Sequence, residues 1–158
     1  MFGLSMTNSN FSFKTKVGDT VPHFKMENLA GEELAIEDFR GKVVLLAFFG
    51  TKCPPCLKEL PQVQAKLRSQ ISKDSFEVLA IAPLDNKSNL TKFNAKHQFD
   101  FTYIPDVGKK IFSLFAQSSL PRTVVLDPKG KIVYQSQGYY KTAFNNMVDL
   151  ISTEISKL

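Results

Sequence analysis

The arrangement of apolar residues along the chain predicts strands that alternate with helices. Residues 43–49 form an unbroken apolar run of seven residues, VVLLAFF, far short of the roughly 18 that a membrane span requires. A run of strand length and this composition is typical of a strand buried on both faces, so we expect a central parallel strand here. Residues 76–82 have the same character and predict a second buried strand.

Helical periodicity follows the first of these strands. Between residues 54 and 70 the apolar positions Cys56, Leu60, Val63 and Leu67 recur at spacings of three and four, which predicts a helix. The same reasoning predicts three further helices and one short strand. The helices are expected over residues 90–98, 107–116 and 140–157, and the strand over residues 101–104.

Turn residues predict a hairpin near each end of the chain. Apolar residues on both sides of residues 28–31 indicate an N-terminal β-hairpin. Residues 127–130 read Asp-Pro-Lys-Gly, an order that a type I turn accepts, and they join expected strands at 123–126 and 131–136. Alternating strands and helices that end in a hairpin and a helix predict an α/β domain with a mixed central sheet flanked by helices.

Composition and charge exclude several classes of protein. A chain of 158 residues fits one domain, and 43% hydrophobic with 22% charged residues argues against disordered, collagen-like and coiled-coil proteins. The net charge of +5 comes from scattered basic residues, so we expect no nucleic-acid partner. Residues 5–12 are rich in Ser and Asn. We therefore expect residues 1–16 to form a flexible leader and residues 17–158 the domain.

The candidate chemistry lies in the two cysteines, Cys53 and Cys56, which follow the first buried strand in the sequence Cys-Pro-Pro-Cys. Cys53 would lie at or next to the N-cap of the helix, with the two prolines in its first turn, where no N–H partner is lost. The free N–H groups and the positive end of the helix dipole favour a thiolate there, and Lys52 adds a cation. Such surroundings lower a cysteine pKa from ~8.5 to about 3.5–7.5.

Cys56 is expected one helical turn later, within disulfide reach and on the apolar face. Cys56 is thus expected to be more buried and less reactive than Cys53. This difference predicts that Cys53 attacks a partner's disulfide and that Cys56 resolves the mixed disulfide. A zinc site needs about four ligands, and His23 and His97 are far from the cysteines in sequence. Haem attachment would need His where Leu57 stands. Two structural free cysteines are the remaining alternative.

With these motifs the sequence resembles the thioredoxin superfamily, in particular the TlpA/ResA-like thiol-disulfide oxidoreductases with a redoxin-type N-terminal extension. The resemblance runs from about Val17 to the C-terminus. It rests on residues 18–24 (GDTVPHF), residues 41–45 (GKVVL), the Cys-Pro-Pro-Cys motif, Pro61 and the pair Leu120-Pro121. It implies a thioredoxin fold with an extra N-terminal hairpin and an insertion, over residues 101–116, before the cis-proline strand.

The resemblance also implies a groove that binds substrate. Pro121 would be the family's cis-proline beside the cysteines, and the backbone that precedes it, at Leu120, would pair with a bound peptide. Lys52 and Pro54 would border this groove, and Gly138 would lie on its rim. An ordinary turn glycine is an equally good interpretation of Gly138. Members of the family usually carry Trp at position 52 and at position 49, whereas this chain has no Trp.

Glu59 is a further candidate, because related proteins often have a glutamate three residues after the second cysteine. Cys56 and Glu59 stand at i and i+3, so they lie on neighbouring parts of one helix face. Partial desolvation there would raise the pKa of the carboxyl group and let it pass protons to and from the thiols. The alternative is an ordinary solvated glutamate near Lys58.

The function implied by the resemblance is dithiol-disulfide exchange with protein thiols and disulfides. It requires no cofactor and no metal, and it requires a redox partner that recycles the dithiol. We expect a monomer that acts outside the cytoplasm and has an export signal or membrane tether absent from this chain; residues 1–10 lack the pattern of a signal peptide. A cytoplasmic location is the alternative.

Two other function classes stay open. A peroxiredoxin-like peroxidase shares the N-terminal extension, but its motif would need Ser or Thr at Gly50 and Pro at Leu46. A non-catalytic thioredoxin-like module would bind a metal or a partner instead.

Overall fold

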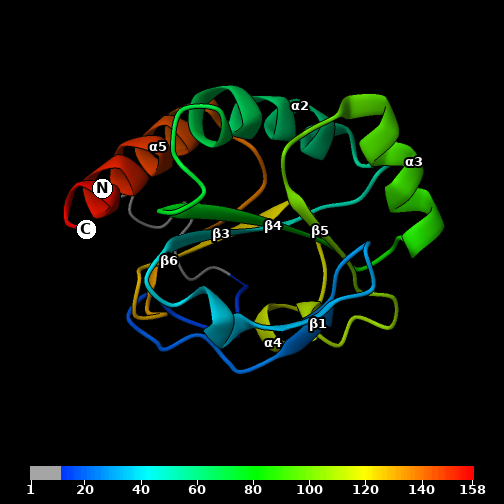
Figure 1. Cartoon of the computed structure of the whole chain (residues 1–158), viewed down its shortest axis with the longest axis horizontal. Helices are drawn as coiled ribbons and strands as arrows, with labels where there is room; N and C mark the ends of the chain where they lie inside the picture. The colour runs from blue at the N-terminus through cyan, green and yellow to red at the C-terminus, as the bar shows by residue number, and fades with distance from the viewer. Residues whose placement is uncertain (1–11) are drawn as a thin grey trace.

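The computed structural model describes residues 12–158 and places a five-stranded sheet at the centre of the molecule (Figure 1). The strand order is β5-β4-β3-β6-β7. The strands are β3 (Val43–Phe48), β4 (Phe76–Ala82), β5 (Thr102–Pro105), β6 (Arg122–Leu126) and β7 (Ile132–Gln137).

The sheet is mixed, as the sequence predicts. β3 is its central strand and is buried at every position, because its continuous apolar run leaves no polar face for solvent. It pairs in parallel with β4, with Leu46 opposite Leu79, and antiparallel with β6, with Leu46 opposite Val124. The turn over residues 127–130 joins β6 to β7, as expected, and the N–H of Gly130 donates to the Asp127 carbonyl at 2.9 Å. These pairings confirm the predicted α/β class.

Helices cover both faces of the sheet. Two core clusters occupy the face that holds α2 (Pro54–Val63), α3 (Lys87–His97) and α5 (Lys141–Ser156); α2 and α5 lie above the sheet in Figure 1. The other face packs against α4 (Phe112–Phe115) and the N-terminal hairpin. The end of β3 is therefore packed from both sides, which holds the loop that follows it in place. No helix within residues 12–158 is long and apolar enough to span a bilayer.

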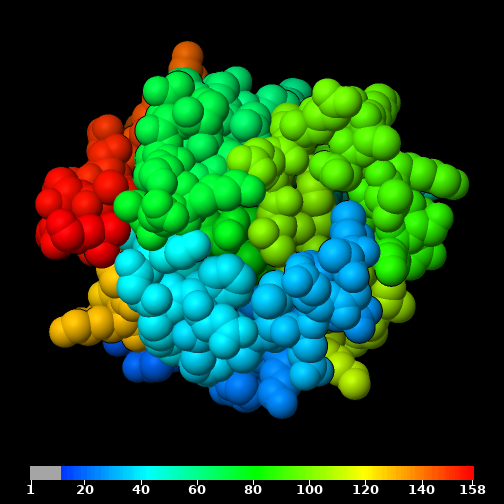
Figure 2. All heavy atoms as spheres, in the orientation of Figure 1, coloured from blue at the N-terminus to red at the C-terminus, as the bar shows by residue number. Residues whose placement is uncertain are grey.

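The N-terminal hairpin is present as predicted and forms its own two-stranded sheet. β1 (Lys25–Glu27) and β2 (Glu33–Ala35) pair antiparallel, and a short 3₁₀ helix, η1 (Ile36–Phe39), follows. Met26 is the buried residue of β1 and joins the core below the main sheet. Figure 2 shows the blue hairpin segment packed against the yellow-green segment that follows α3.

The residues before the hairpin contact the domain closely. Thr15 is buried, and its hydroxyl donates to the Gln135 amide oxygen at 3.0 Å, while the Gln135 amide returns a bond to the Thr15 carbonyl at 2.7 Å. The Lys14 N–H donates to the Phe115 carbonyl at 2.7 Å. Of the leader expected over residues 1–16, residues 12–16 thus form a docked segment, which we call the N-terminal arm. The remainder of that leader lies outside the described residues.

Two predicted helices differ from the structure by more than a few residues at their ends. The helix expected over residues 107–116 is wrong for its first five residues, and only Phe112–Phe115 is helical. The Asp106 carboxylate accepts the N–H groups of Ile111 and Phe112, at 3.0 and 2.8 Å, and the intervening Gly108 and Lys109 have positive φ. Because the Asp106 side chain binds these N–H groups, residues 107–111 form a closed turn instead of the first turns of a helix.

The helix expected over residues 54–70 changes type along its length. α2 ends at Val63, and residues Gln64–Arg68 continue as a π-helical segment, η2, in which the Ser69 N–H donates to the Gln64 carbonyl at 2.9 Å. Pro61 lies inside α2, where its ring nitrogen cannot donate a helical hydrogen bond.

Candidate active site

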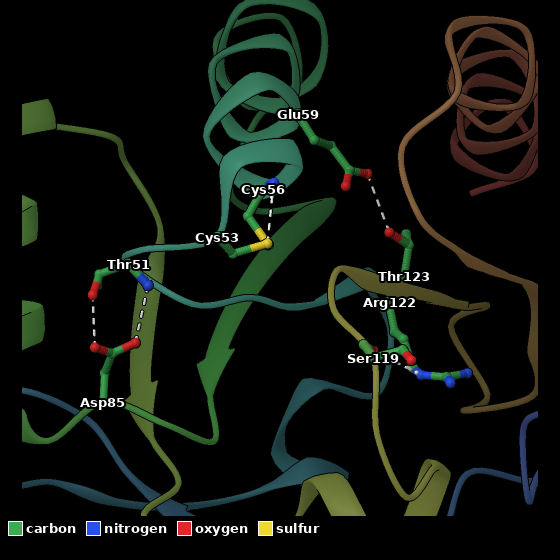
Figure 3. Close-up of a disulfide and its surroundings, with 8 residues drawn as sticks. All are labelled: Thr51, Cys53, Cys56, Glu59, Asp85, Ser119, Arg122 and Thr123. Carbon is green, nitrogen blue, oxygen red and sulfur yellow. Dashed lines mark hydrogen bonds between the residues drawn. A yellow bond between two sulfur atoms is a disulfide. The ribbon is translucent and has the colours of Figure 1, made fainter.

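Cys53 and Cys56 are joined by a disulfide at the start of α2 (Figure 3). Their Cα atoms are 5.2 Å apart, within the usual range for a disulfide. Cys53 is the N-cap residue with extended backbone angles, and Pro54 and Pro55 occupy the first helical turn. The N–H of Cys56 donates to the Cys53 sulfur at 3.4 Å. The helix N-terminus thus faces the first sulfur, as the sequence predicts.

The two sulfurs have different surroundings. Cys56 is completely buried, in a core cluster with Leu60 of α2 and Phe93 of α3. Cys53 is half-buried, and Lys52 and Pro54 on either side of it are exposed. A partner molecule can therefore reach only the first sulfur of the pair.

Asp85 holds the turn that leads into Cys53, a role that no motif in the sequence predicts. Its carboxylate accepts the Thr51 N–H at 3.0 Å and the Thr51 hydroxyl at 2.6 Å, and it also accepts the Asn89 amide at 3.2 Å. Asp85 is 6% exposed, so these charge-assisted bonds are shielded from water and fix the turn firmly.

A cleft of about 490 Å³ lies beside Cys53. Three segments that are distant in sequence build it: the turn after β3, the loop between β4 and α3 together with the first turn of α3, and the loop before β6. Its lining residues are Gly50, Lys52, Cys53, Leu84, Asp85, Asn89, Ser119 and Leu120. Leu84 is two-thirds exposed, so the cleft offers an apolar surface next to the reactive sulfur.

The loop before β6 carries the cis peptide bond between Leu120 and Pro121. Leu120 lines the cleft, and Pro121 is buried behind it. Within residues 12–158, neither the N–H nor the carbonyl of Leu120 has a hydrogen-bond partner. Gly138 is not part of the cleft lining; its N–H donates to the Pro121 carbonyl at 2.8 Å and so supports the loop from the side of β7.

Glu59 points from α2 toward the start of β6, where its carboxylate accepts a bond from the Thr123 hydroxyl at 3.2 Å (Figure 3). The side chain is buried, with 7% of the residue exposed. Burial raises the pKa of Glu59 from 4.5 to about 7, and the Thr123 bond opposes part of that rise. The alternative of a solvated helix glutamate does not describe this side chain.

Neither histidine lies near the cysteines as a metal ligand. The His23 ring contacts the Glu37 carboxylate at 2.9 Å near the hairpin, and the His97 ring stacks on Phe99 at the end of α3. Across residues 12–158, no group of three or more His, Cys, Asp or Glu side chains is arranged to hold a metal ion.

Known proteins share both the sequence pattern and the fold. The model of the AhpC/TSA family matches residues 17–135. The ResA thiol-disulfide oxidoreductase of Geobacillus thermodenitrificans is 33% identical over 132 residues, which cover 82% of this chain and 75% of that protein. The ResA protein of Bacillus subtilis is 29% identical over 133 residues, covering 83% and 74% of the two chains.

Solved structures agree on the architecture. The thioredoxin domain of a thiol-disulfide oxidoreductase from Bacteroides vulgatus superposes with a TM-score of 0.72 at 19% identity, over 87% of this chain and 99% of that one. StoA from Bacillus subtilis gives a TM-score of 0.66 at 23% identity, over 82% and 96% of the two chains. These structures support the fold, and the sequence relatives support the branch. The chain belongs to the AhpC/TSA family of the thioredoxin superfamily, as a TlpA/ResA-like member.

Proposed function

We propose that the protein exchanges electrons with protein thiols and disulfides through Cys53 and Cys56. The observation that carries this proposal is the unequal access to the two sulfurs: Cys53 lies half-buried at a cleft and at a helix N-terminus, whereas Cys56 is sealed in the core. Thiol-disulfide exchange needs one sulfur that meets the partner and a second that stays close behind it.

In the reduced protein the Cys53 thiolate attacks one sulfur of a partner disulfide. A mixed disulfide forms, and the other partner sulfur leaves as a thiolate that takes up a proton. Cys56 then loses its proton and attacks the Cys53 sulfur, which forms the disulfide seen here and releases the second partner thiol. The partner gains two electrons and two protons; Cys56 supplies one proton and solvent the other, because Cys53 reacts as a thiolate. The reverse sequence oxidises a partner dithiol.

Glu59 would serve as the proton carrier of this cycle. A carboxyl group with a pKa of about 7 exchanges protons readily near neutral pH, and Glu59 is one helical turn from Cys56. We therefore expect Glu59→Gln to alter the pH dependence of thiol exchange between about pH 5 and about pH 9, the window in which tuned acid-base groups operate.

The substrate would be a peptide segment bound along the cleft. The unpaired N–H and carbonyl of Leu120 offer two backbone hydrogen bonds to an extended chain, which is how exposed strand edges bind peptides. Lys52, in the place of the family's usual Trp, adds a cation rather than an aromatic surface at the entrance. Acidic or polar residues next to the substrate cysteine would suit this entrance.

A trapping experiment tests the assignment of the two cysteines. Cys56→Ser removes the resolving sulfur, so mixed disulfides with partners should accumulate, remain on non-reducing gels and disappear with reductant. Cys53→Ser should trap little, because its remaining sulfur is buried, and the variant lacking both cysteines gives the background. Equal capture by the two single variants would contradict the assignment. Rapid consumption of peroxide at low concentration by the wild type would favour the alternative function, a peroxiredoxin-like peroxidase.

We also propose that the protein works outside the cytoplasm, as a monomer recycled by a second redox protein. This proposal rests on the resemblance to the TlpA/ResA-like branch. A thiol reagent that cannot cross membranes should label the free Cys53 of Cys56→Ser in intact cells of the native host. Labelling only after lysis would place the protein in the cytoplasm.

A further inference from the structure

Arg122 is a buried cation directly after the cis-proline. It is 2% exposed, and none of the ion pairs among residues 12–158 includes it. Its partners are instead neutral oxygens. A buried charge is costly unless its N–H donors are satisfied. These hydrogen bonds therefore fix the positions of the chain segments that supply the oxygens.

Two of the oxygens belong to the loop that lines the cleft. The Arg122 Nε donates to the carbonyls of Ser118 and Ser119, at 2.9 and 3.0 Å, and Nη2 donates to the Ser118 carbonyl at 2.7 Å. Ser119 has a φ of 76°, a left-handed conformation that residues other than glycine rarely adopt. The guanidinium therefore holds a loop whose conformation would otherwise be disfavoured.

The N-terminal arm covers the other side of the guanidinium. Nη1 and Nη2 donate to the carbonyl and the hydroxyl of Ser12, at 3.3 and 3.0 Å, and the guanidinium carbon lies 4.7 Å from the centre of the Phe13 ring. In Figure 3 the Arg122 side chain extends away from the cysteines. It cannot act on the sulfurs directly, so any influence on exchange passes through the loop.

We propose that Arg122 is a positioning residue for peptide binding, which orients the backbone of Leu120 toward a substrate at Cys53 and is itself locked by the N-terminal arm. The chain of contacts runs from Ser12 and Phe13 through the guanidinium to the Ser118 and Ser119 carbonyls, and Leu120 follows at once. This proposal rests on the proposed function, because it assumes that peptide substrates pair with Leu120.

The test compares two disulfides of different size. Reduced protein is mixed with a small aromatic disulfide, which needs only the Cys53 sulfur, and with a disulfide-linked peptide, which also needs the backbone of the loop. In Arg122→Met the ratio of the peptide rate constant to the small-disulfide rate constant should fall about tenfold, the equivalent of one backbone hydrogen bond at the upper end of its range. In Arg122→Lys, which donates to one carbonyl at a time, the ratio should fall less.

Arg68 provides a matched control. It is also buried, at 3% exposed; it donates to the carbonyls of Phe76 and Ile71, and it lies over the Phe76 ring, but it belongs to η2, outside the cleft. Arg68→Met should lower stability without changing the ratio. A second variant, Phe13→Ala, removes the ring that covers the guanidinium and should lower the ratio in the same direction as Arg122→Met.

The outcomes separate the two proposals. A wild type that reacts with neither disulfide would overturn the proposed function itself. The role of Arg122 would be overturned if the wild type reacts with both disulfides and the ratio of the two rate constants in Arg122→Lys and Phe13→Ala equals that in Arg68→Met. The proposed function would then still stand. Because Arg122→Lys and Phe13→Ala are mild changes, the test does not depend on whether Arg122→Met folds.

Discussion

Glu59→Gln should change how the stability of the oxidised protein depends on pH. The Glu59 carboxyl group is buried, and within residues 12–158 its only hydrogen-bond partner is the Thr123 hydroxyl, so the folded protein prefers the neutral acid. Glutamine keeps the shape and the neutrality of that acid but cannot ionise. The substitution therefore isolates the cost of a buried carboxylate at this position.

The magnitude follows from the pKa of Glu59. Its rise from 4.5 to about 7 means that ionisation costs the folded state about 3 kcal/mol more than the unfolded chain, at 1.36 kcal/mol for each pKa unit. The folded state binds the extra proton between these two values, so stability falls as pH rises. The contribution is complete below pH 4.5 and is lost as pH rises through about 7.

Urea unfolding of the disulfide-bonded proteins at about pH 4 and about pH 8 gives the assay. The free energy of unfolding of Glu59→Gln minus that of the wild type should increase by about 3 kcal/mol between the two pH values. Glu33 is the exposed residue of β2, so Glu33→Gln controls for the general effect of removing a carboxylate. Thr123→Val removes the hydroxyl that stabilises the carboxylate, so it should raise the pKa of Glu59 further. A difference between Glu59→Gln and wild type that stays constant with pH would refute the reasoning.

Three further predictions concern the surroundings of the cysteines. Asp85→Asn should lower the free energy of unfolding by about 2 kcal/mol, measured in urea, because the charged acceptor that holds the turn before Cys53 is lost. Gly138→Ala should cost more than about 1 kcal/mol in the same assay, because φ is +85° and the new Cβ would lie 2.9 Å from a ring carbon of Tyr140; no loss would contradict this. In the reduced protein, alkylation should modify Cys53 at least about tenfold faster than Cys56, followed by mass spectrometry; equal rates would contradict the burial argument.

The parts of the fold that the sequence predicts well are those in which local pattern and tertiary packing agree. The strand at residues 43–48 is buried on both faces, so its apolar run has only one structural interpretation. The N-cap position of Cys53 is equally local, since the prolines that follow it suit the first turn of a helix. The helix expected from residue 90 instead begins at Lys87, because the Asn86 side chain accepts the Asn89 N–H at 2.8 Å and caps the helix there; the apolar pattern does not include this N-cap.

The parts that escaped prediction depend on distant partners. Ile111, Phe112 and Phe115 are buried and have helical spacing, yet the Asp106 carboxylate takes the N–H groups that a longer helix would use. Arg122 reaches Ser12, 110 positions away, and nothing in either local sequence indicates it. Only the folded chain brings such groups together.

The short separation of the cysteines has a consequence for handling the protein. Cys53 and Cys56 are only three positions apart, so a chain that has lost its tertiary structure can still close this ring. The cleft beside them, by contrast, draws on residues from position 50 to position 120 and exists only when β3, β4 and β6 are in register. Counting free thiols therefore reports the redox state of a preparation but not the fraction of the protein that is folded and active. A fully oxidised sample can be wholly unfolded, and an active fraction must be measured by binding or turnover.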